Sequence, residues 1–163
     1  MATTIETSVK ERKLGFRILF LGMFAIGTGQ TLFIAVLPPY ARGLGLTEVQ
    51  VGFIFSLSAL GWMMMSPFWG RKSDFIGRKS IIILGLLIYA FTTVLMGLEF
   101  RLNELGYINL STLFGLLIFT RGCYGFLGSG AHSASMAYVA DRTTEKERSG
   151  VMAVMGSAFA ISG

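Results

Sequence analysis

The chain has 163 residues, of which 53% are apolar and only 14% are charged, and its mean hydropathy is +0.64. Soluble domains carry about 25% charged residues, so this composition excludes a soluble globular protein. The net charge is +5, but the charged residues gather in short clusters between long uncharged stretches, so a nucleic-acid partner is not expected. One Cys and one His exclude a disulfide framework and a thiolate zinc site, and we expect neither a metal nor a cofactor.

The uncharged stretches predict membrane-spanning helices, because about 20 apolar residues cross the ~30 Å hydrocarbon layer of a bilayer. We expect four complete spans, at residues 16–37, 49–69, 80–98 and 111–139, and the start of a fifth at residues 149–163. At 1.5 Å per residue the fifth stretch reaches only about 22 Å. We therefore expect residues 1–163 to form a partial transmembrane bundle, a fragment of a longer one.

The first span follows a basic segment, as the apolar core of a secretory signal peptide would. Its apolar run is longer than the core of a signal peptide, which has about 7 to 15 residues. It ends in Pro38-Pro39-Tyr40-Ala41-Arg42, without a small-residue cleavage site. We therefore expect a permanent membrane span.

Lys and Arg are unevenly divided between the segments that connect the spans. The N-terminal arm has four, residues 71–79 have four and residues 142–148 have three, whereas Arg42 and Arg101 stand alone in the two other segments. Short loops rich in Lys and Arg stay in the cytoplasm. The ratio of eleven to two therefore predicts a cytoplasmic N-terminus.

Two spans are expected to begin with the same signal, a Thr followed three residues later by Gln or Glu. Thr47 with Gln50 and Thr144 with Glu147 each fit a capping box. Spans two and five then start alike, which is typical of the inverted repeats of secondary transporters.

Glycine recurs at three-residue spacing in the fourth expected span, at Gly122, Gly125 and Gly128. Small residues allow membrane helices to approach closely, so this face is expected to contact other helices and not lipid. The pattern fits dense packing and a moving interface equally well.

The segment between the second and third spans carries a specific motif. It matches the pattern G-x-x-x-D-x-x-G-R-K, with the fixed positions at Gly70, Asp74, Gly77, Arg78 and Lys79. The preference for positive cytoplasmic loops explains the basic residues but neither the acid nor the glycines. The acid fits a local partner, either Arg78 or the positive N-terminal end of another helix. Such a loop can act as a latch.

This loop resembles the signature loop of the major facilitator superfamily, and the upstream Gly61 and Pro67 resemble the longer form found in its drug:proton antiporters. The resemblance implies an all-α integral membrane protein, here the first four to five transmembrane helices of the N-terminal six-helix bundle of a twelve- or fourteen-helix transporter. It also implies a conformational latch. In that latch Asp74 docks on a helix of the missing C-terminal half, and Arg78 pairs with Asp141 at the end of span four.

The resemblance extends through the fourth span. Residues 121–125, Arg-Gly-Cys-Tyr-Gly, are similar to the family motif R-x-x-q-G, with Tyr124 in place of the amide. Residues 137–148 resemble the exit from span four in tetracycline-exporter-like members. The family implies that Arg121 faces the central cavity, where it attracts anionic groups or perturbs a proton carrier.

Few polar side chains lie within the expected spans. A charge there costs about 2.5 to 3.5 kcal/mol, and Arg121 is the one charge inside the spans apart from Arg17 at the edge of the first. Its alternative role is structural, with the side chain reaching the rim of the membrane. His132, eleven residues on, is expected on the same face, either titrating near neutral pH or packed as a neutral ring. In span one Gln30 and Thr28 are among the polar side chains, and the acid found in many drug:proton antiporters is absent.

We therefore expect a secondary active transporter, and not an enzyme, that exports a small amphipathic compound by alternating access in exchange for protons. Its cavity residues would be Arg121, Gln30 and His132. The expected partners are the small-molecule substrate, the proton as coupling ion, the lipid bilayer and the missing C-terminal half, and the expected location is the bacterial plasma membrane. An uptake porter for a metabolite or sugar is one alternative, and a non-transporting membrane protein or truncated remnant is another.

Overall fold

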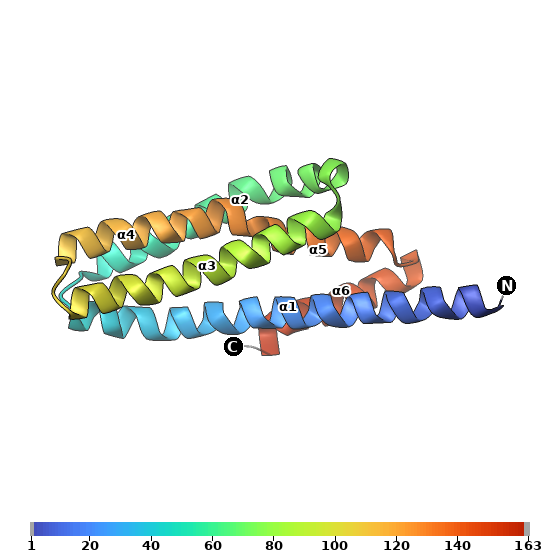
Figure 1. Cartoon of the computed structure of the whole chain (residues 1–163), viewed down its shortest axis with the longest axis horizontal. Coiled ribbons are helices and arrows are strands. Elements are labelled where there is room, and N and C mark those ends of the chain that lie inside the picture. The colour runs from blue at the N-terminus through green and yellow to red at the C-terminus, as the bar shows by residue number, and fades with distance from the viewer. Residues whose placement is uncertain (1, 162–163) are drawn as a thin grey trace. The chain divides into compact units, whose positions relative to one another are not determined.

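The computed structural model describes residues 2–161, and within this part it contains helices and no strand. In chain order the helices are α1 (Ala2–Gly43), α2 (Glu48–Ile76), α3 (Arg78–Glu104), α4 (Leu110–Cys123), η1 (Tyr124–Gly128), α5 (Ser129–Asp141) and α6 (Glu145–Ile161) (Figure 1). Four segments are long and apolar enough to cross a membrane: Glu11–Gly43, Glu48–Ile76, Arg78–Glu104 and Leu110–Asp141. The all-α membrane fold expected from the sequence is confirmed.

The chain divides into two compact units. The first comprises Met1–Leu32 and Ser135–Gly163, and the second comprises Phe33–Ala134. The first therefore holds most of α1, the second half of α5 and all of α6. The second holds the end of α1, the whole of α2, α3, α4 and η1, and the start of α5.

In the second unit α2, α3, α4 and η1 pack against one another. The connections from α1 to α2 and from α3 to α4 are short, so successive helices run antiparallel, as Figure 1 shows for α2, α3 and α4. An apolar core lies between the helix ends near these two connections. Its buried residues are Leu37, Ala41, Leu46, Val51, Ile54, Met96, Leu113 and Leu117.

Helix α1 continues past residue 37, the expected end of the first span, and contains Pro38 and Pro39. Proline lacks a backbone N–H and usually ends or kinks a helix. Here Leu37 and Ala41 are buried in the apolar core. Arg42 Nε also donates a hydrogen bond to the Pro38 carbonyl at 3.2 Å. Burial of Leu37 and Ala41 in the apolar core favours the longer helix.

Side-chain caps precede α2, α4 and α6. Thr47 Oγ1 accepts a hydrogen bond from Gln50 N at 3.3 Å, and Gln50 Oε1 accepts one from Thr47 N at 2.8 Å, which confirms the predicted capping box of α2. At α6, Thr144 N donates to Glu147 Oε2 at 3.4 Å, which is half of the predicted box. Asn109 Oδ1 accepts a bond of 2.8 Å from a backbone N–H in the first turn of α4. These caps satisfy donors that the first turn of a helix leaves without a backbone partner.

Glycines allow α2 and η1 to approach each other closely. A Cβ added at Gly125 would lie 2.5 Å from the Ser58 carbonyl oxygen of α2. A Cβ at Gly122 would lie 3.7 Å from a side chain of α2. The predicted contact of this glycine face with another helix is confirmed for these two residues. Gly128 instead faces a side chain of its own helical segment.

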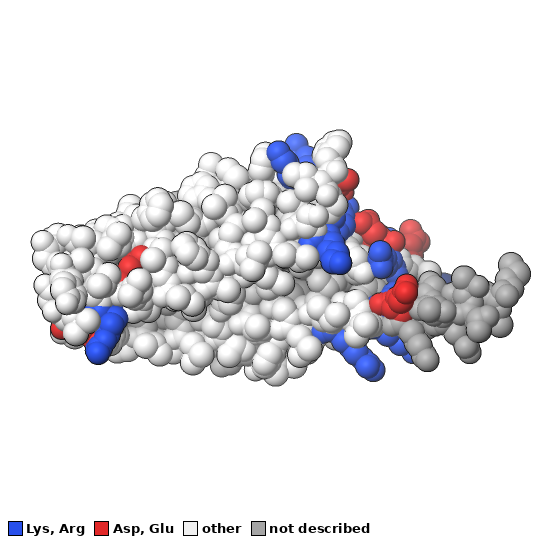
Figure 2. Space-filling view, in the orientation of Figure 1, with Lys and Arg blue, Asp and Glu red and all other residues white. Residues whose placement is uncertain are grey.

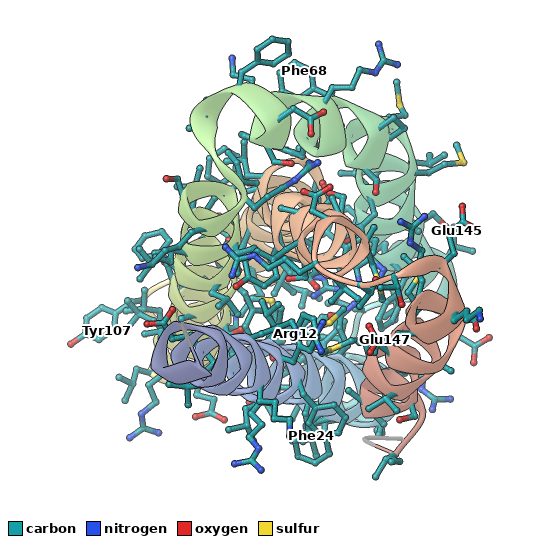
Figure 3. All side chains as sticks on the ribbon, turned by 90° about the vertical axis from the view of Figure 1, so that its right-hand side faces the viewer. Arg12, Phe24, Phe68, Tyr107, Glu145 and Glu147 are labelled. Carbon is teal, nitrogen blue, oxygen red and sulfur yellow. The ribbon has the colours of Figure 1, made fainter. Side chains whose placement is uncertain are left out.

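The outward faces of the spanning helices are apolar. Phe53, Leu87, Phe91 and Val94 are exposed there. Figure 2 shows charged side chains gathered near the helix ends and an uncharged surface along the helices between them. In the end-on view of Figure 3, Phe68 points outward from α2. This distribution suits contact with the hydrocarbon of a bilayer.

Replacing Gly125 by Ala is expected to lower the melting temperature of the full-length protein in detergent. The added Cβ would press on the backbone of α2, and such overpacking costs about 1–3 kcal/mol. Gly97→Ala on α3 is the matched control, because nothing lies within 4 Å of a Cβ at that position. Thermal unfolding in the same detergent compares both variants with wild type. Equal melting temperatures for the two variants would contradict the close approach.

The orientation predicted from Lys and Arg is tested with thiol labelling at two exposed positions. Phe75, near the end of α2, is 90% exposed, and Tyr107, just after α3, is 75% exposed. In a full-length protein without other cysteines, a membrane-impermeant thiol reagent is expected to label Tyr107→Cys in intact cells. Phe75→Cys is expected to react only after the membrane has been opened. The reverse pattern would place the N-terminus outside.

Candidate functional site

Helices α2 and α3 meet at a single residue, Gly77. Gly77 has φ +101° and ψ 134°, a backbone conformation that residues with a Cβ rarely adopt. Its N–H donates a hydrogen bond of 3.0 Å to the Ser73 carbonyl, which closes the last turn of α2. This turn therefore requires the second glycine of the motif.

Arg78, the first residue of α3, folds back onto the last turns of α2. Its guanidinium forms an ion pair with Asp74, which is one of the two local partners expected for that acid. Arg78 Nη1 also donates to the Ser73 hydroxyl at 2.5 Å and to the Gly70 carbonyl at 3.2 Å. The Ser73 hydroxyl donates to the same carbonyl at 2.6 Å. Arg78 is therefore held where a helix C-terminus favours a cation.

The remaining polar residues of the predicted latch are more exposed. The Asp74 side chain is 51% exposed, and Lys79 and Asp141 lie on the surface. Arg78 and Asp141 belong to different compact units. The pairing of these two residues stays a prediction.

Trp69 connects the latch loop to η1, a contact that the motif does not indicate. Its indole Nε1 donates a hydrogen bond of 2.8 Å to the Phe126 carbonyl. A Cβ at Gly130 would lie 3.3 Å from the Trp69 ring, so α5 begins against the same side chain. The end of α2 is thereby fixed to the middle of the helical segment that carries Arg121.

Arg121 is 6% exposed at the end of α4. Its Cζ lies 4.1 Å from the ring centroid of Phe33 and 5.0 Å from that of Tyr124. The Tyr124 ring in turn lies 5.7 Å from that of Tyr89. Each cation–π contact of a desolvated Arg contributes about 2 kcal/mol. Arg121 thus lies among aromatic rings inside the second unit, three helical turns beyond the start of α4.

His132 has different surroundings from Arg121. Its ring centroid lies 5.2 Å from that of Trp62, whereas Arg121 lies against Phe33 and Tyr124. The expected common face assumed regular α-helix over the eleven residues between them, but η1 is a π-helix. A π-helical turn closes at i→i+5 and inserts about one residue, which rotates the residues after it by about 100°. The regular helical spacing from which Arg121 and His132 were expected on one face is therefore interrupted by η1.

Gln30 and Thr28 lie on α1 in the first unit. Gln30 is half-buried. The Thr28 hydroxyl donates to the Phe24 carbonyl of its own helix at 2.9 Å. Because Gln30 and Arg121 belong to different units, a shared role in one cavity stays a prediction.

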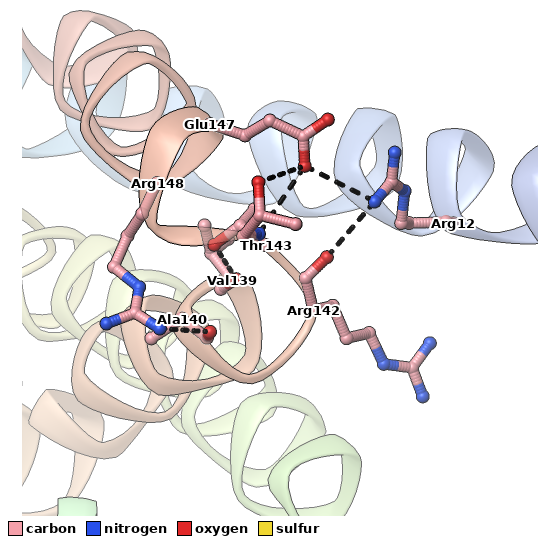
Figure 4. A network of polar contacts seen from close by, with 8 residues as sticks. Arg12, Val139, Ala140, Arg142, Thr143, Glu147 and Arg148 are labelled. Atoms are coloured by element: carbon pink, nitrogen blue, oxygen red, sulfur yellow. Dashed lines mark hydrogen bonds and ion pairs between the residues drawn. The ribbon is translucent and has the colours of Figure 1, made fainter.

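In the first unit, Arg12 of α1 binds the turn between α5 and α6 (Figure 4). Its Nη1 lies 3.5 Å from Glu147 Oε2 and donates to the Arg142 carbonyl at 3.4 Å. Arg148 Nη2 donates to the Ala140 carbonyl at 3.2 Å within the same turn. Exposed pairs of this kind contribute only about 0–1 kcal/mol. They connect Arg12 to the residues between α5 and the first turn of α6.

Glu99 is a buried acid that the expected spans leave out. The third span was expected to end at residue 98, but α3 continues to Glu104, and Glu99 is 2% exposed. Thr120 of α4 donates a hydrogen bond to Glu99 Oε1. A sequence signal exists, because Glu99 follows the buried Gly85 and Thr92 at intervals of seven residues. The expected span stopped at the residue before this charge. A buried acid on the face of Gly85 and Thr92 was therefore missed.

Comparison with known proteins places these features in a family. Residues 19–163 match the Major Facilitator Superfamily. The chain is 33% identical over 155 residues to "Multidrug resistance protein 2" of Bacillus subtilis (strain 168), which covers 95% of this chain and 36% of that protein. It is 40% identical over 73 residues to "Quinolone resistance protein NorA" of Staphylococcus aureus (strain Mu50 / ATCC 700699), which covers 45% of this chain and 19% of that protein. The chain belongs to the Major Facilitator Superfamily.

Proposed function

We propose that the chain is the N-terminal part of a proton-coupled transporter that exports a small amphipathic compound by alternating access. The family is one of membrane transporters, and two similar proteins are named for resistance to drugs. The chain spans 36% and 19% of their lengths, so the activity of the whole protein is part of the proposal. The observation that carries it is the network around Arg78, which supports a role of this loop as a latch.

The latch would act by stabilising one conformation. Arg78 holds the turn at Gly77 through Asp74, Ser73 and the Gly70 carbonyl. The exposed part of the Asp74 carboxylate is then available to the positive end of a helix in the C-terminal half. This docking keeps the cytoplasmic side closed, and its loss moves the population toward the inward-open state.

Arg78 can serve a further partner. A guanidinium has five N–H donors in a planar fork, so Arg78 can bind Asp141 together with its partners on α2. Lys79 adds positive charge beside it. The latch that we propose therefore consists of Gly70, Asp74, Gly77, Arg78, Lys79 and Asp141.

Arg121 and the rings around it suit an amphipathic compound. The aromatic faces of Phe33 and Tyr124 provide apolar contact area, and the guanidinium attracts anionic groups or perturbs a nearby proton carrier. We assign Gln30 and His132 to the same cavity as further polar groups. Each lies in a spanning helix and is partly buried.

Uptake of a metabolite or sugar is the second candidate function. Residues 16–37 contain no Asp or Glu, whereas many drug:proton antiporters carry an acid in span one. Flux measurements in cells distinguish the two directions. Energy-dependent removal of a preloaded amphipathic dye supports export, and energy-dependent accumulation of a metabolite supports uptake.

Arg78→Asp or Asp141→Arg alone is expected to lower the transport rate of the full-length protein, because each variant places like charges in the latch. The double exchange is expected to recover part of the rate, and partly buried pairs couple more strongly than exposed ones, whose coupling is about 0–1 kcal/mol. The measurement is a double-mutant cycle on transport rate in proteoliposomes.

The matched control for this cycle is Lys72→Asp, because Lys72 is an exposed basic residue of the same loop. It should change the rate less than Arg78→Asp and should not be rescued by Asp141→Arg. Losses that simply add in the Arg78 and Asp141 cycle would contradict the pairing.

Arg121→Ala is expected to abolish transport while leaving insertion into the membrane intact. Arg121→Lys keeps the charge but loses the planar stacking on the rings, so partial activity is expected. Dye efflux measures transport, and immunoblots of membranes measure insertion. Arg101→Ala, at an exposed site near the end of α3, is the control. Normal efflux by Arg121→Ala would assign Arg121 a purely structural role.

A further inference from the structure

Glu99 is an enclosed acid that neither the latch nor the proposed cavity uses. The residue is 2% exposed. Thr120 on α4 donates a hydrogen bond to Oε1, while Oε2 is buried and has no hydrogen-bond partner among the described residues. Within the described part of the chain, the Thr120 hydroxyl is thus the only hydrogen-bond partner of this carboxyl group.

The neighbouring turns on both helices carry apolar core side chains. Met96 precedes Glu99 by one turn of α3 and belongs to the buried core. Leu113 and Leu117 precede Thr120 by two turns and one turn of α4, and both are fully buried in the same core. Buried apolar residues therefore lie one turn before the pair on each helix.

The charged and titratable groups on the surrounding elements have other partners. Toward the connected ends of these helices, and next to Thr120, these groups are Tyr40 and Arg42 on α1, Glu48 on α2, Arg101 and Glu104 on α3, and Arg121 on α4. Tyr40 and Arg101 both bind Glu104, Arg42 pairs with Glu48, and the Arg121 guanidinium lies against aromatic rings. In the part of the chain that the structure describes, Glu99 forms no ion pair.

A negative charge is disfavoured in such a site. An ionised carboxylate in an apolar interior needs a cation or several donors in place of its hydration water, and Glu99 has a single hydroxyl. A neutral carboxylic acid needs less, because it carries no charge and can either donate to the Thr120 oxygen or accept from its hydroxyl. The surroundings therefore favour the protonated side chain.

We propose that Glu99 and Thr120 form a proton-binding site between α3 and α4. The site holds a proton in this conformation and releases it when α3 and α4 separate enough to admit water. The role of the site in transport rests on the proposed proton coupling. Its occupancy by a proton does not, and it can be measured separately.

The exchange moves one proton and no electrons. The Glu99 carboxylate takes H⁺ from water and forms an O–H bond, and this bond breaks when the opened site returns H⁺ to water. Glu99 lies five residues, or about 7.5 Å, before the end of α3, and Gly77 is at the other end of that helix. With the predicted orientation the site takes its proton from outside the cell, and exchange for an exported compound requires that the proton is then released to the cytoplasm.

The test compares the full-length wild-type protein with Glu99→Gln, which preserves size and a hydrogen bond but cannot gain or lose a proton. In lipid, infrared difference spectra are expected to show a protonated carboxyl at neutral pH in wild type, and this band should be missing in Glu99→Gln. Glu99→Asp should shift the band and so assign it. In proteoliposomes, transport of an amphipathic dye driven by a pH gradient should fall about tenfold or more in Glu99→Gln. Dye exchange without a gradient should stay within about twofold of wild type.

Glu104→Gln is the matched control, because Glu104 is an exposed glutamate five residues further along the same helix. It should retain both the band and gradient-driven transport. A wild-type protein without the protonated band at neutral pH would overturn the proposal, and so would wild-type gradient-driven transport by Glu99→Gln. Lack of gradient-driven transport in wild type would overturn the proposed function, whereas the infrared result would still decide whether Glu99 binds a proton.

Discussion

A polar group inside the hydrocarbon of a bilayer has no water to bind, so it must find its partners within the protein. Backbone groups meet this requirement through the helices themselves. Side chains join the helices at a few places: Trp69 binds η1 and Thr120 binds Glu99 within the spanning segments, and Arg78 binds the end of α2 at the membrane surface. The apolar core only needs to be filled, but each of these joints requires particular atoms at particular places. They determine which faces of α2, α3 and α4 meet.

In the latch loop, each residue of a short motif makes a different contribution to the joint between α2 and α3. Gly77 supplies a backbone conformation, Arg78 supplies the donors, and the Gly70 carbonyl and Ser73 hydroxyl receive them. Ser73 occupies a variable position of the family pattern, yet it is buried and bonded on both sides. The Asp74 side chain stays about half exposed, and Lys79 lies on the surface. The loop therefore bonds its own turn together and presents charges of both signs outward.

The spans, the capping box at Thr47 and the Arg78 partner of Asp74 could be predicted because they depend on composition or on residues close in sequence. Three features could not. The π-helix at Tyr124–Gly128 has no signature in residue type and arises where η1 packs against α2 and α3. The contact of Arg121 with Phe33 joins distant segments. Glu99 was hidden because a charge was taken as the end of a span, whereas packing against α4 keeps it inside.

The single-residue connection at Gly77 makes the length of the loop as important as its composition. Because α2 and α3 are joined with no slack, one inserted or deleted residue would turn every side chain of α3 by about 100° relative to α2. Glu99 lies near the far end of α3, 22 residues after Gly77. The rotation would carry it away from Thr120. The turn thus determines the rotation of the whole of α3 about its axis. A change of loop length at one membrane surface would displace side chains near the other surface.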